Sequence, residues 1–287
     1  MVVETIELLA PARGGLFVDC TIGLGGHAGA LLDAGAARVL GLDRDPDAVG
    51  RARDALARFG DRVEIVHADY RQLEAVLDDR GIARVDGALA DLGVSSMQLE
   101  AEGRGFSFRR DEPLDMRMDR SSGATAADIV AEMDEEALAN VIFEFGEERY
   151  SRRIARAIVA ARKDSAIETT GRLAAIVRRA IPRRGYQRID PATRTFQALR
   201  IFVNRELEGL DRFLAAASRR LLAGARLAVI TFHSLEDRIV KHAFRALEKG
   251  QAAVRILTKR PLEPSDDEIR RNPRARSAKL RAIERLA

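Results

Sequence analysis

Short apolar runs that end in an aspartate recur through the first third of the chain. They close at Asp19, Asp43, Asp69 and Asp91, so that successive acids lie 24, 26 and 22 residues apart. Each interval leaves room for one strand and one helix, and residues 48–59 carry apolar side chains at helical spacing. Strands that alternate with helices in this way predict an α/β fold with a mainly parallel sheet covered on both faces. Ligands of such sheets bind beyond the carboxyl ends of the strands, where the four aspartates would gather.

The next apolar strand, predicted over residues 226–232, follows Asp91 by well over a hundred residues. One crossover helix needs far fewer, and helical periodicity between the two strands predicts an inserted helical domain. We therefore expect three parts. They are the first part of a core over 1–105, an inserted substrate-recognition domain over 106–198, and the second part of the core, with a basic C-terminal tail, over 199–287.

Two helices near the last strand are predicted in more detail. The apolar stripe between Thr195 and Leu222 predicts one long helix. After the strand, Ser234 and Asp237 are typical of a capping-box-like helix start. His233 stands where strand and helix meet, and either a substrate contact or a local structural role fits it.

A glycine-rich turn follows the first apolar run, in Gly23-x-Gly25-Gly26-x-Ala28. Glycines allow a sharp turn and a close approach to a ligand, and a helix start offers free N–H donors. A plain turn and a dinucleotide site both fit the pattern, the latter with Asp43 as the ribose-binding acid. Asp19, four residues before Gly23, favours another ligand, because it would repel a pyrophosphate and attract an ammonium group. The sequence therefore favours S-adenosylmethionine over NAD.

Roles for the remaining cofactor-edge residues follow from their chemistry. Asp43 would accept hydrogen bonds from both ribose hydroxyls. Asp69 would receive the exocyclic amine of an adenine while Tyr70 covers a face of the ring. We expect His27 to contact the cofactor through its backbone, although a histidine at a helix start also serves as a cap or lines a turn.

The segment Asp91–Gln98 is the candidate centre of the chemistry. A base amine is a poor nucleophile, and a carboxylate that accepts its N–H would help to localise the lone pair. Asp91 is the candidate acceptor, or else it binds only the amino-acid end of the cofactor; Ser95, Ser96 and Gln98 would position cofactor or base. Phe106 and Phe108 would sandwich an extruded base or anchor the insertion to the core.

Composition limits the class of protein. The chain of 287 residues has one cysteine and four histidines, which provide neither a disulfide framework nor zinc-ligand spacing. We expect no metal. No segment is long and apolar enough for a membrane span, and the start lacks the pattern of a secretory peptide, so we expect a cytoplasmic protein.

Positive charge is concentrated in two segments. Residues 145–205 hold 15 Lys/Arg against 5 Asp/Glu, and residues 255–287 hold 10 against 5, in a chain of net charge +4. Either segment alone fits a solvated surface. Together, beside an acidic small-molecule site, they favour a nucleic acid partner, with the loop 181–188 as a candidate for phosphate contacts and base stacking.

Several motifs in one order resemble those of the bacterial 16S ribosomal RNA cytosine-N4 methyltransferases, nearly from end to end. They are Asp-Cys-Thr-x-Gly-x-Gly-Gly-His (19–27), Asp-Leu-Gly-Val-Ser-Ser-x-Gln (91–98), Gly-Phe-Ser-Phe (105–108), Pro-Leu-Asp-Met-Arg-Met-Asp (113–119), Ala-Thr-Arg-Thr-Phe-Gln-Ala-Leu-Arg (192–200), Phe-His-Ser-Leu-Glu-Asp-Arg-Ile-Val-Lys (232–241) and Asn-Pro-Arg-Ala-Arg-Ser (272–277).

The resemblance implies a Rossmann-like class I methyltransferase core with an inserted helical domain and S-adenosylmethionine as cofactor. It implies as substrate a decoding-region cytosine of 16S rRNA within the small ribosomal subunit. By matching motifs, the family's cofactor contacts fall on Gly25, Gly26, His27, Asp43, Tyr70, Asp91 and Gln98. The Asp/Asn-Pro-Pro-aromatic tetrad usual in amino-methylating enzymes is absent after Asp91, so the geometry there must differ from theirs.

Two other functions stay open at this point. A non-catalytic RNA-binding assembly factor would use the cofactor fold only as a scaffold. An NAD-dependent oxidoreductase would require Asp19 to tolerate a nearby pyrophosphate.

Overall fold

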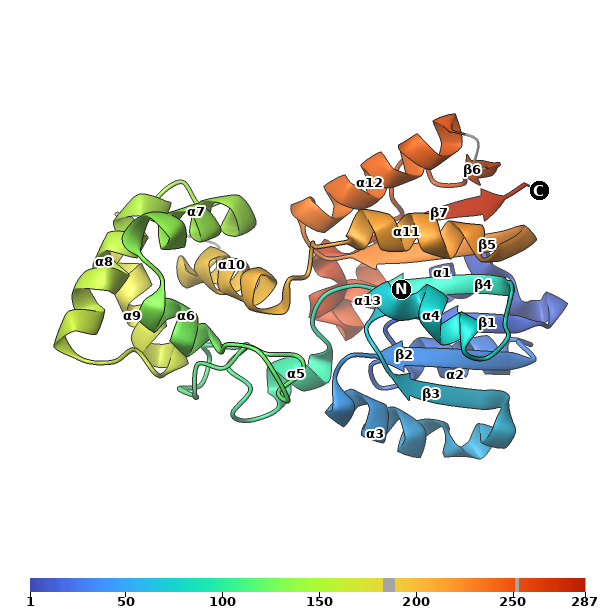
Figure 1. The fold of residues 1–287 in the computed structure, drawn as a ribbon, viewed down its shortest axis with the longest axis horizontal. Helices are drawn as coiled ribbons and strands as arrows, with labels where there is room; N and C mark the ends of the chain where they lie inside the picture. The colour runs from blue at the N-terminus through green and yellow to red at the C-terminus, as the bar shows by residue number, and fades with distance from the viewer. Residues whose placement is uncertain (183–188, 251–252, 287) are drawn as a thin grey trace. The chain divides into compact units, whose positions relative to one another are not determined.

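The computed structural model describes residues 1–182, 189–250 and 253–286 (Figure 1). The chain divides into two compact units, one made of Met1–Gly93 with Leu207–Ala287 and the other of Val94–Glu206. We call them the core unit and the helical unit. The helical unit extends beyond the expected 106–198 at both ends. Among the described residues, no helix combines the length and the apolar character that a bilayer crossing requires.

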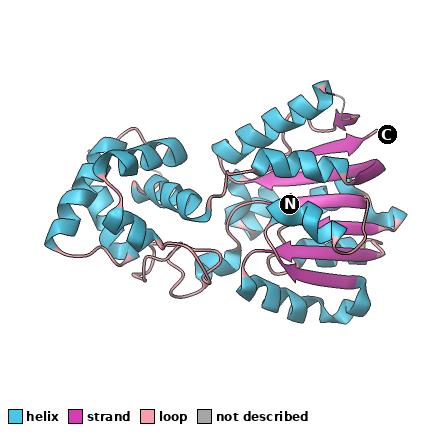
Figure 2. Cartoon of the chain, in the orientation of Figure 1, coloured by secondary structure: helices cyan, strands magenta, loops and turns pink. Residues whose placement is uncertain are grey.

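A seven-stranded sheet forms the centre of the core unit, as far as the described residues show, in the order β3-β2-β1-β4-β5-β7-β6 (Figure 2). Its strands are β1 (Leu16–Asp19), β2 (Arg38–Asp43), β3 (Val63–His67), β4 (Val85–Asp91), β5 (Leu221–Thr231), β6 (Val254–Ile256) and β7 (Lys279–Arg285). The first five pair in parallel, and β7 runs antiparallel to both of its neighbours. The predicted α/β fold with a mainly parallel sheet is confirmed.

Helices cover both faces of this sheet. They are α1 (Val2–Leu9), α2 (Gly26–Asp33), α3 (Pro46–Leu56), α4 (Leu73–Asp78), α11 (Leu210–Arg219) and α12 (Ser234–Lys249). The short helix α13 (Asp266–Arg271) has no buried residue and covers neither face. Alternate strand residues serve the two layers, because successive side chains of a strand point to opposite faces. Phe17 and Leu89 pack with α1, α2 and α3. Val18 and Ala88 pack with α4, α11 and α12.

The carboxyl ends of the strands match the prediction closely. Three of the four predicted strands end at the expected acid, Asp19, Asp43 or Asp91. The third strand, β3, stops at His67, and Asp69 instead caps the short 3-10 helix η3 (Tyr70–Gln72). Parallel pairing of β1 with β2 and β4 brings these acids to one edge of the sheet.

The long helix predicted between Thr195 and Leu222 is wrong. Helix α10 (Ala192–Asn204) ends before Arg205, whose φ of 51° lies in the left-handed region, and α11 begins only at Leu210. The Arg200 guanidinium donates to both carboxylate oxygens of Glu206 at 2.8 Å, which holds the turn. This break is where the chain passes from the helical unit to the core unit.

The helical unit has an apolar core of its own. Its helices are α5 (Ser96–Glu100), α6 (Ala126–Glu132), α7 (Glu135–Gly146), α8 (Ser151–Asp164), α9 (Thr170–Ala180) and α10. Phe106 is buried in this core, and the Phe108 ring meets that of Phe196 edge-on with centroids 4.7 Å apart. Both rings therefore serve packing within the helical unit.

Candidate active site

The glycine turn joins β1 to α2 with two residues in the left-handed region. The φ angles of Gly23 and Gly25 are 52° and 83°. A Cβ on Gly25 would lie 2.8 Å from a Leu56 methyl carbon, so this position requires glycine. A Cβ on Gly26 would meet no atom within 4 Å, so the backbone at the start of α2 faces open space. A ligand can therefore approach the chain closely at Gly26.

Two acids and a histidine meet beside this turn. Asp19 is 1% exposed, and its Oδ1 accepts the Thr21 N–H at 3.2 Å. Asp91 reaches the same place from β4, with its Oδ2 3.6 Å from His27 Nδ1. Asp19 Oδ2, Asp91 Oδ1 and His27 Nε2 have no hydrogen-bond partner among the described residues. Buried polar atoms are rarely left unpaired, so this cluster fits a polar ligand.

The electrostatics of the cluster favour a cation as that ligand. Burial raises the pKa of Asp19 to about 7, and the charges of Asp91 and Asp43 add to the effect. Burial also raises the pKa of Asp91 to about 7. His27 is uncharged at neutral pH, because burial lowers its pKa to about 4. A bound ammonium group would relieve the repulsion between the two carboxylates.

Asp43 links the glycine turn to the start of α3. Its Oδ2 accepts the Gly23 N–H at 2.8 Å, and its Oδ1 accepts the Asp45 N–H at 2.9 Å. Burial raises the pKa of Asp43 as well. Each carboxylate oxygen keeps acceptor capacity beyond one hydrogen bond, so two ribose hydroxyls fit this residue.

Asp69 and Tyr70 lie near the same edge but are engaged with protein neighbours. The Asp69 carboxylate accepts two hydrogen bonds from Arg71, from Nε at 2.7 Å and from Nη2 at 2.6 Å. Burial opposes ionisation of this carboxyl, yet the Arg71 guanidinium holds the pKa of Asp69 below its usual value. The Tyr70 ring is buried against Phe213, with centroids 4.7 Å apart. Their expected adenine contacts stay predictions.

Gln98 belongs to the helical unit and completes a capping box at the start of α5. Its Oε1 accepts the Ser95 N–H at 2.9 Å, and its own N–H donates to Ser95 Oγ at 3.2 Å. Its expected cofactor contact stays a prediction. The loop residues 183–188, expected to touch phosphate, lie outside the described residues.

Sequence reasoning missed the way in which α12 begins. His233, not Ser234, caps this helix, and Glu236, not Asp237, is the third helical residue of the capping box. Glu236 is 1% exposed; its Oε2 accepts the Phe232 N–H at 2.9 Å, and its Oε1 lies 3.1 Å from His233 Nε2. Asp237 instead accepts two hydrogen bonds from Arg281. The spacing His-x-x-Glu was the available signal, but histidine is an uncommon cap.

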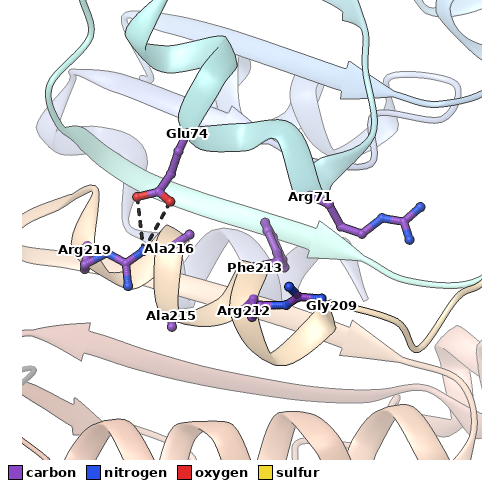
Figure 3. Close-up of a pocket in the computed structure, with 8 residues that line it drawn as sticks. All are labelled: Arg71, Glu74, Gly209, Arg212, Phe213, Ala215, Ala216 and Arg219. Atoms are coloured by element: carbon purple, nitrogen blue, oxygen red, sulfur yellow. Dashed lines mark hydrogen bonds and ion pairs between the residues drawn. The ribbon is translucent and has the colours of Figure 1, made fainter.

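A separate cleft of about 480 Å³ lies on the outer surface of the core unit, between α4 and α11 (Figure 3). Arg212 and the small residues of α11 line it, and Glu74 pairs with Arg219 across it. Arg71, which also lines the cleft, is bound to Asp69. None of the predicted site residues is among the described residues that line the cleft. The cleft is linked to them through Arg71, which pairs with Asp69.

The sheet order, the glycine turn after β1 and the acids at the ends of β1, β2 and β4 define the class. This is a class I methyltransferase that uses S-adenosylmethionine, and the buried Asp19 Oδ2, which has no hydrogen-bond partner among the described residues, fits the ammonium group of that cofactor.

The chain belongs to the MraW methylase family, whose model matches residues 1–286. It is 50% identical to the ribosomal RNA small subunit methyltransferase H of Sorangium cellulosum over 99% of this chain and 89% of that protein. Proteins of the same name from Nitrobacter winogradskyi and Nitratidesulfovibrio vulgaris strain DP4 are each 51% identical, over 98% and 99% of this chain and 88% and 93% of theirs. Membership in a methylase family confirms the predicted S-adenosylmethionine cofactor and removes the oxidoreductase alternative.

Proposed function

We propose that this protein transfers a methyl group from S-adenosylmethionine to the N4 amine of a cytosine in the decoding region of 16S rRNA, within the small ribosomal subunit. The observation that carries the proposal is that two buried carboxylate oxygens beside the glycine turn, Asp19 Oδ2 and Asp91 Oδ1, have no hydrogen-bond partner in the part of the chain that the structure describes. The names of the relatives supply the substrate class. A ribosomal substrate implies work in the cytoplasm.

Cofactor binding is divided among residues of the core unit. S-adenosylmethionine supplies an electrophilic methyl group when bound. Asp19 attracts its ammonium group, Asp43 accepts from its ribose hydroxyls, and the Gly25–Gly26 backbone allows its close approach. His27, uncharged at neutral pH, approaches Asp91 Oδ2 and orients that carboxylate.

Asp91 is the proposed catalytic residue. Its Oδ1 accepts an N–H of the target amine, which localises the nitrogen lone pair toward the methyl group. The product amine must lose a proton, and Asp91, with its pKa raised to about 7 by burial, is able to take it at neutral pH. The Asp91 backbone is held in turn, because its N–H donates to Thr21 Oγ1 at 2.6 Å.

The helical unit is the proposed substrate-recognition domain. The basic segment 145–205 lies within it, and the exposed side chains of Arg152, Arg153 and Arg179 add positive charge to α8 and α9. Such side chains suit contacts with the phosphate backbone of RNA.

Labelled S-adenosylmethionine with unmodified small subunits tests the proposal, followed by mass spectrometry of the product nucleosides. We expect N4-methylcytidine from the native chain. The variant Asp91→Asn should lose about 10²-fold or more in transfer rate, because it keeps the size of the side chain but not its basicity. Asp61→Asn, an exposed acid at the amino end of β3, is the matched control and should keep full activity.

Other outcomes point elsewhere. RNA binding without incorporation of label would support the assembly-factor alternative. Full turnover by Asp91→Asn would remove Asp91 from the chemistry and leave it a cofactor ligand at most.

A further inference from the structure

The segment that leads into β7 lies at the same edge of the sheet as the candidate active site. Strand β7 is antiparallel to β5, with Lys279 opposite Thr231, so β7 begins where the parallel strand β5 ends (Figure 1). The preceding residues 266–277, which we call the arginine arm, form α13 and the 3-10 helix η4 (Pro273–Ser277). The topology therefore places the arm at the carboxyl edge of the sheet.

Packing agrees with this placement. Ala278, directly after the arm, belongs to the same apolar cluster as Ile22 and Ala28, which flank the glycine turn. Glu268, on α13, is close enough for its charge to act on the His27 imidazole. All of these residues belong to the core unit, so the position of the arm beside the glycine turn does not depend on where the helical unit lies.

The arm presents four exposed arginines in seven residues: Arg270, Arg271, Arg274 and Arg276. No acid lies between Arg270 and Lys279 in the sequence. Two of the arginines contact Asp267. Arg270 forms an ion pair with the Asp267 carboxylate, and Arg271 Nε donates to the Asp267 backbone carbonyl oxygen at 3.4 Å. Arg274 and Arg276 lie on η4.

The backbone of η4 is ordered by its own hydrogen bonds. Asn272 Oδ1 accepts the Arg274 N–H at 3.3 Å, and the Ala275 and Ala278 N–H groups donate within the turn at 3.0 and 2.8 Å. Ala275 is 3% exposed and anchors the turn between the two arginines. A partner that binds Arg274 and Arg276 therefore does not have to order this backbone first.

The part of the core unit that holds the cofactor acids carries a net negative charge, which opposes the approach of RNA. Residues 1–93, which hold the cofactor acids, carry 16 Asp/Glu against 10 Arg, whereas residues 207–287 carry 18 Lys/Arg against 10 Asp/Glu. An RNA strand approaching the acidic part would be repelled. Guanidinium groups at the same edge offset that repulsion, and their fork geometry matches phosphate oxygens.

We infer that Arg274 and Arg276 of the arginine arm bind RNA phosphates next to the target nucleotide, as a phosphate-binding surface of the core unit itself. The inference rests on the proposed function, and it adds a contact outside the helical unit.

The test compares two double variants with equal loss of charge. Arg274→Gln/Arg276→Gln removes the two arginines of η4. Arg13→Gln/Arg38→Gln removes two exposed arginines near the amino ends of β1 and β2, at the opposite edge of the same sheet. Binding of unmodified small subunits is measured over a salt series, together with binding of S-adenosylhomocysteine and the melting temperature.

We expect the η4 variant to bind small subunits severalfold more weakly. The slope of log affinity against log salt should fall by about 1.4 to 1.8, since each phosphate contact contributes about 0.7 to 0.9. In turnover, KM for the subunit should rise while kcat at saturation holds. Affinity for S-adenosylhomocysteine and the melting temperature should match those of the native chain, and the control variant should match it throughout.

The variant Arg274→Lys/Arg276→Lys controls for a folding defect caused by substitution at these positions. It keeps both positive charges and should keep the slope of log affinity against log salt. An η4 variant with an unchanged slope, or with no larger change than the control, would overturn the inference and leave the proposed function intact. If the native chain itself neither binds nor methylates small subunits, the proposed function fails and the inference falls with it.

Discussion

Asp19 is a carboxyl group in a place where water does not solvate its charge. Burial raises its pKa to about 7, far above the usual value of 3.8. In the ligand-free protein, the neutral form is therefore favoured below neutral pH. A cation bound at Oδ2 requires the ionised form, so ligand binding and proton release are linked at this residue.

This linkage gives a pH dependence with a definite sign. Affinity for S-adenosylhomocysteine should rise as the pH increases from about 6 to 8, and level off above, because the carboxyls of Asp19 and Asp91 then bind already ionised. Titration calorimetry in buffers of different ionisation enthalpy checks this through the protons released. Asp19→Asn should bind more weakly and lose part of the dependence. A flat profile for the native chain would contradict the assignment.

The raised pKa of Asp19 also affects stability without ligand. A group whose pKa is higher in the folded than in the unfolded chain contributes stability that is lost as pH rises through the folded value. The free energy of unfolding contributed by Asp19 therefore declines between about pH 4 and 7. A bound ammonium group would offset this loss.

Gly25 and Gly26 are neighbours with opposite expectations. Gly25→Ala should lower the free energy of unfolding by more than 1 kcal/mol, because an alanine there has a strained φ and meets Leu56. Gly26→Ala should leave stability within about 1 kcal/mol, since its Cβ meets nothing, yet weaken cofactor binding at the open backbone. Urea unfolding and S-adenosylhomocysteine titration separate the two effects. Unchanged affinity in Gly26→Ala would move the cofactor away from this backbone.

At the scale of elements, strands and their terminal acids could be predicted because both are local. Continuous apolar runs before Asp19, Asp43 and Asp91 are visible in the sequence and survive as β1, β2 and β4. The break between α10 and α11 was missed, although Gly209, which caps α11 with a φ of 70°, lies within the predicted helix. It depends on a left-handed Arg205 and on the pairing of Arg200 with Glu206, and neither leaves a periodic signal.

The candidate site likewise has residues that the sequence could predict and contacts that it could not. Asp19, His27 and Asp91 were predicted from motif spacing, and the structure brings them together. The engagement of Asp69 with Arg71, and the burial of Tyr70 against Phe213, depend on side-chain partners that spacing does not reveal. The helix cap at His233 was missed for a related reason, because Asp237 is committed to a strand 44 residues away.

The ion pair between Asp237 and Arg281 joins α12 to β7. The Arg281 guanidinium holds Asp237 at 2.7 and 3.1 Å, with both side chains nearly buried. Asp237→Ala should lower the free energy of unfolding by about 3 kcal/mol or more, because it leaves the arginine charge buried and unpaired. Denaturant unfolding measures this. Asp267→Ala, which breaks the exposed pair with Arg270, is the control and should cost at most about 1 kcal/mol; equal losses in both variants would contradict the argument.

At the scale of the whole molecule, the insertion follows from the order of strands. β4 and β5 are parallel neighbours, and the whole helical unit is inserted in the connection between them. A gap of that size between two apolar runs was visible in the sequence. The helical unit spans Val94–Glu206, and the limits 106–198 of a substrate-recognition domain stay a prediction.

The place of β7 has a consequence for biosynthesis. Strand β7, which follows β6 in the sequence, occupies an interior position of the sheet, between β5 and β6. During translation, a nascent chain that has already presented Asp19, Asp43 and Asp91 still lacks this strand, and β6 has no neighbour to pair with. The sheet is complete only after residues 279–285 have been synthesised, because β7 is the strand that joins β6 to β5.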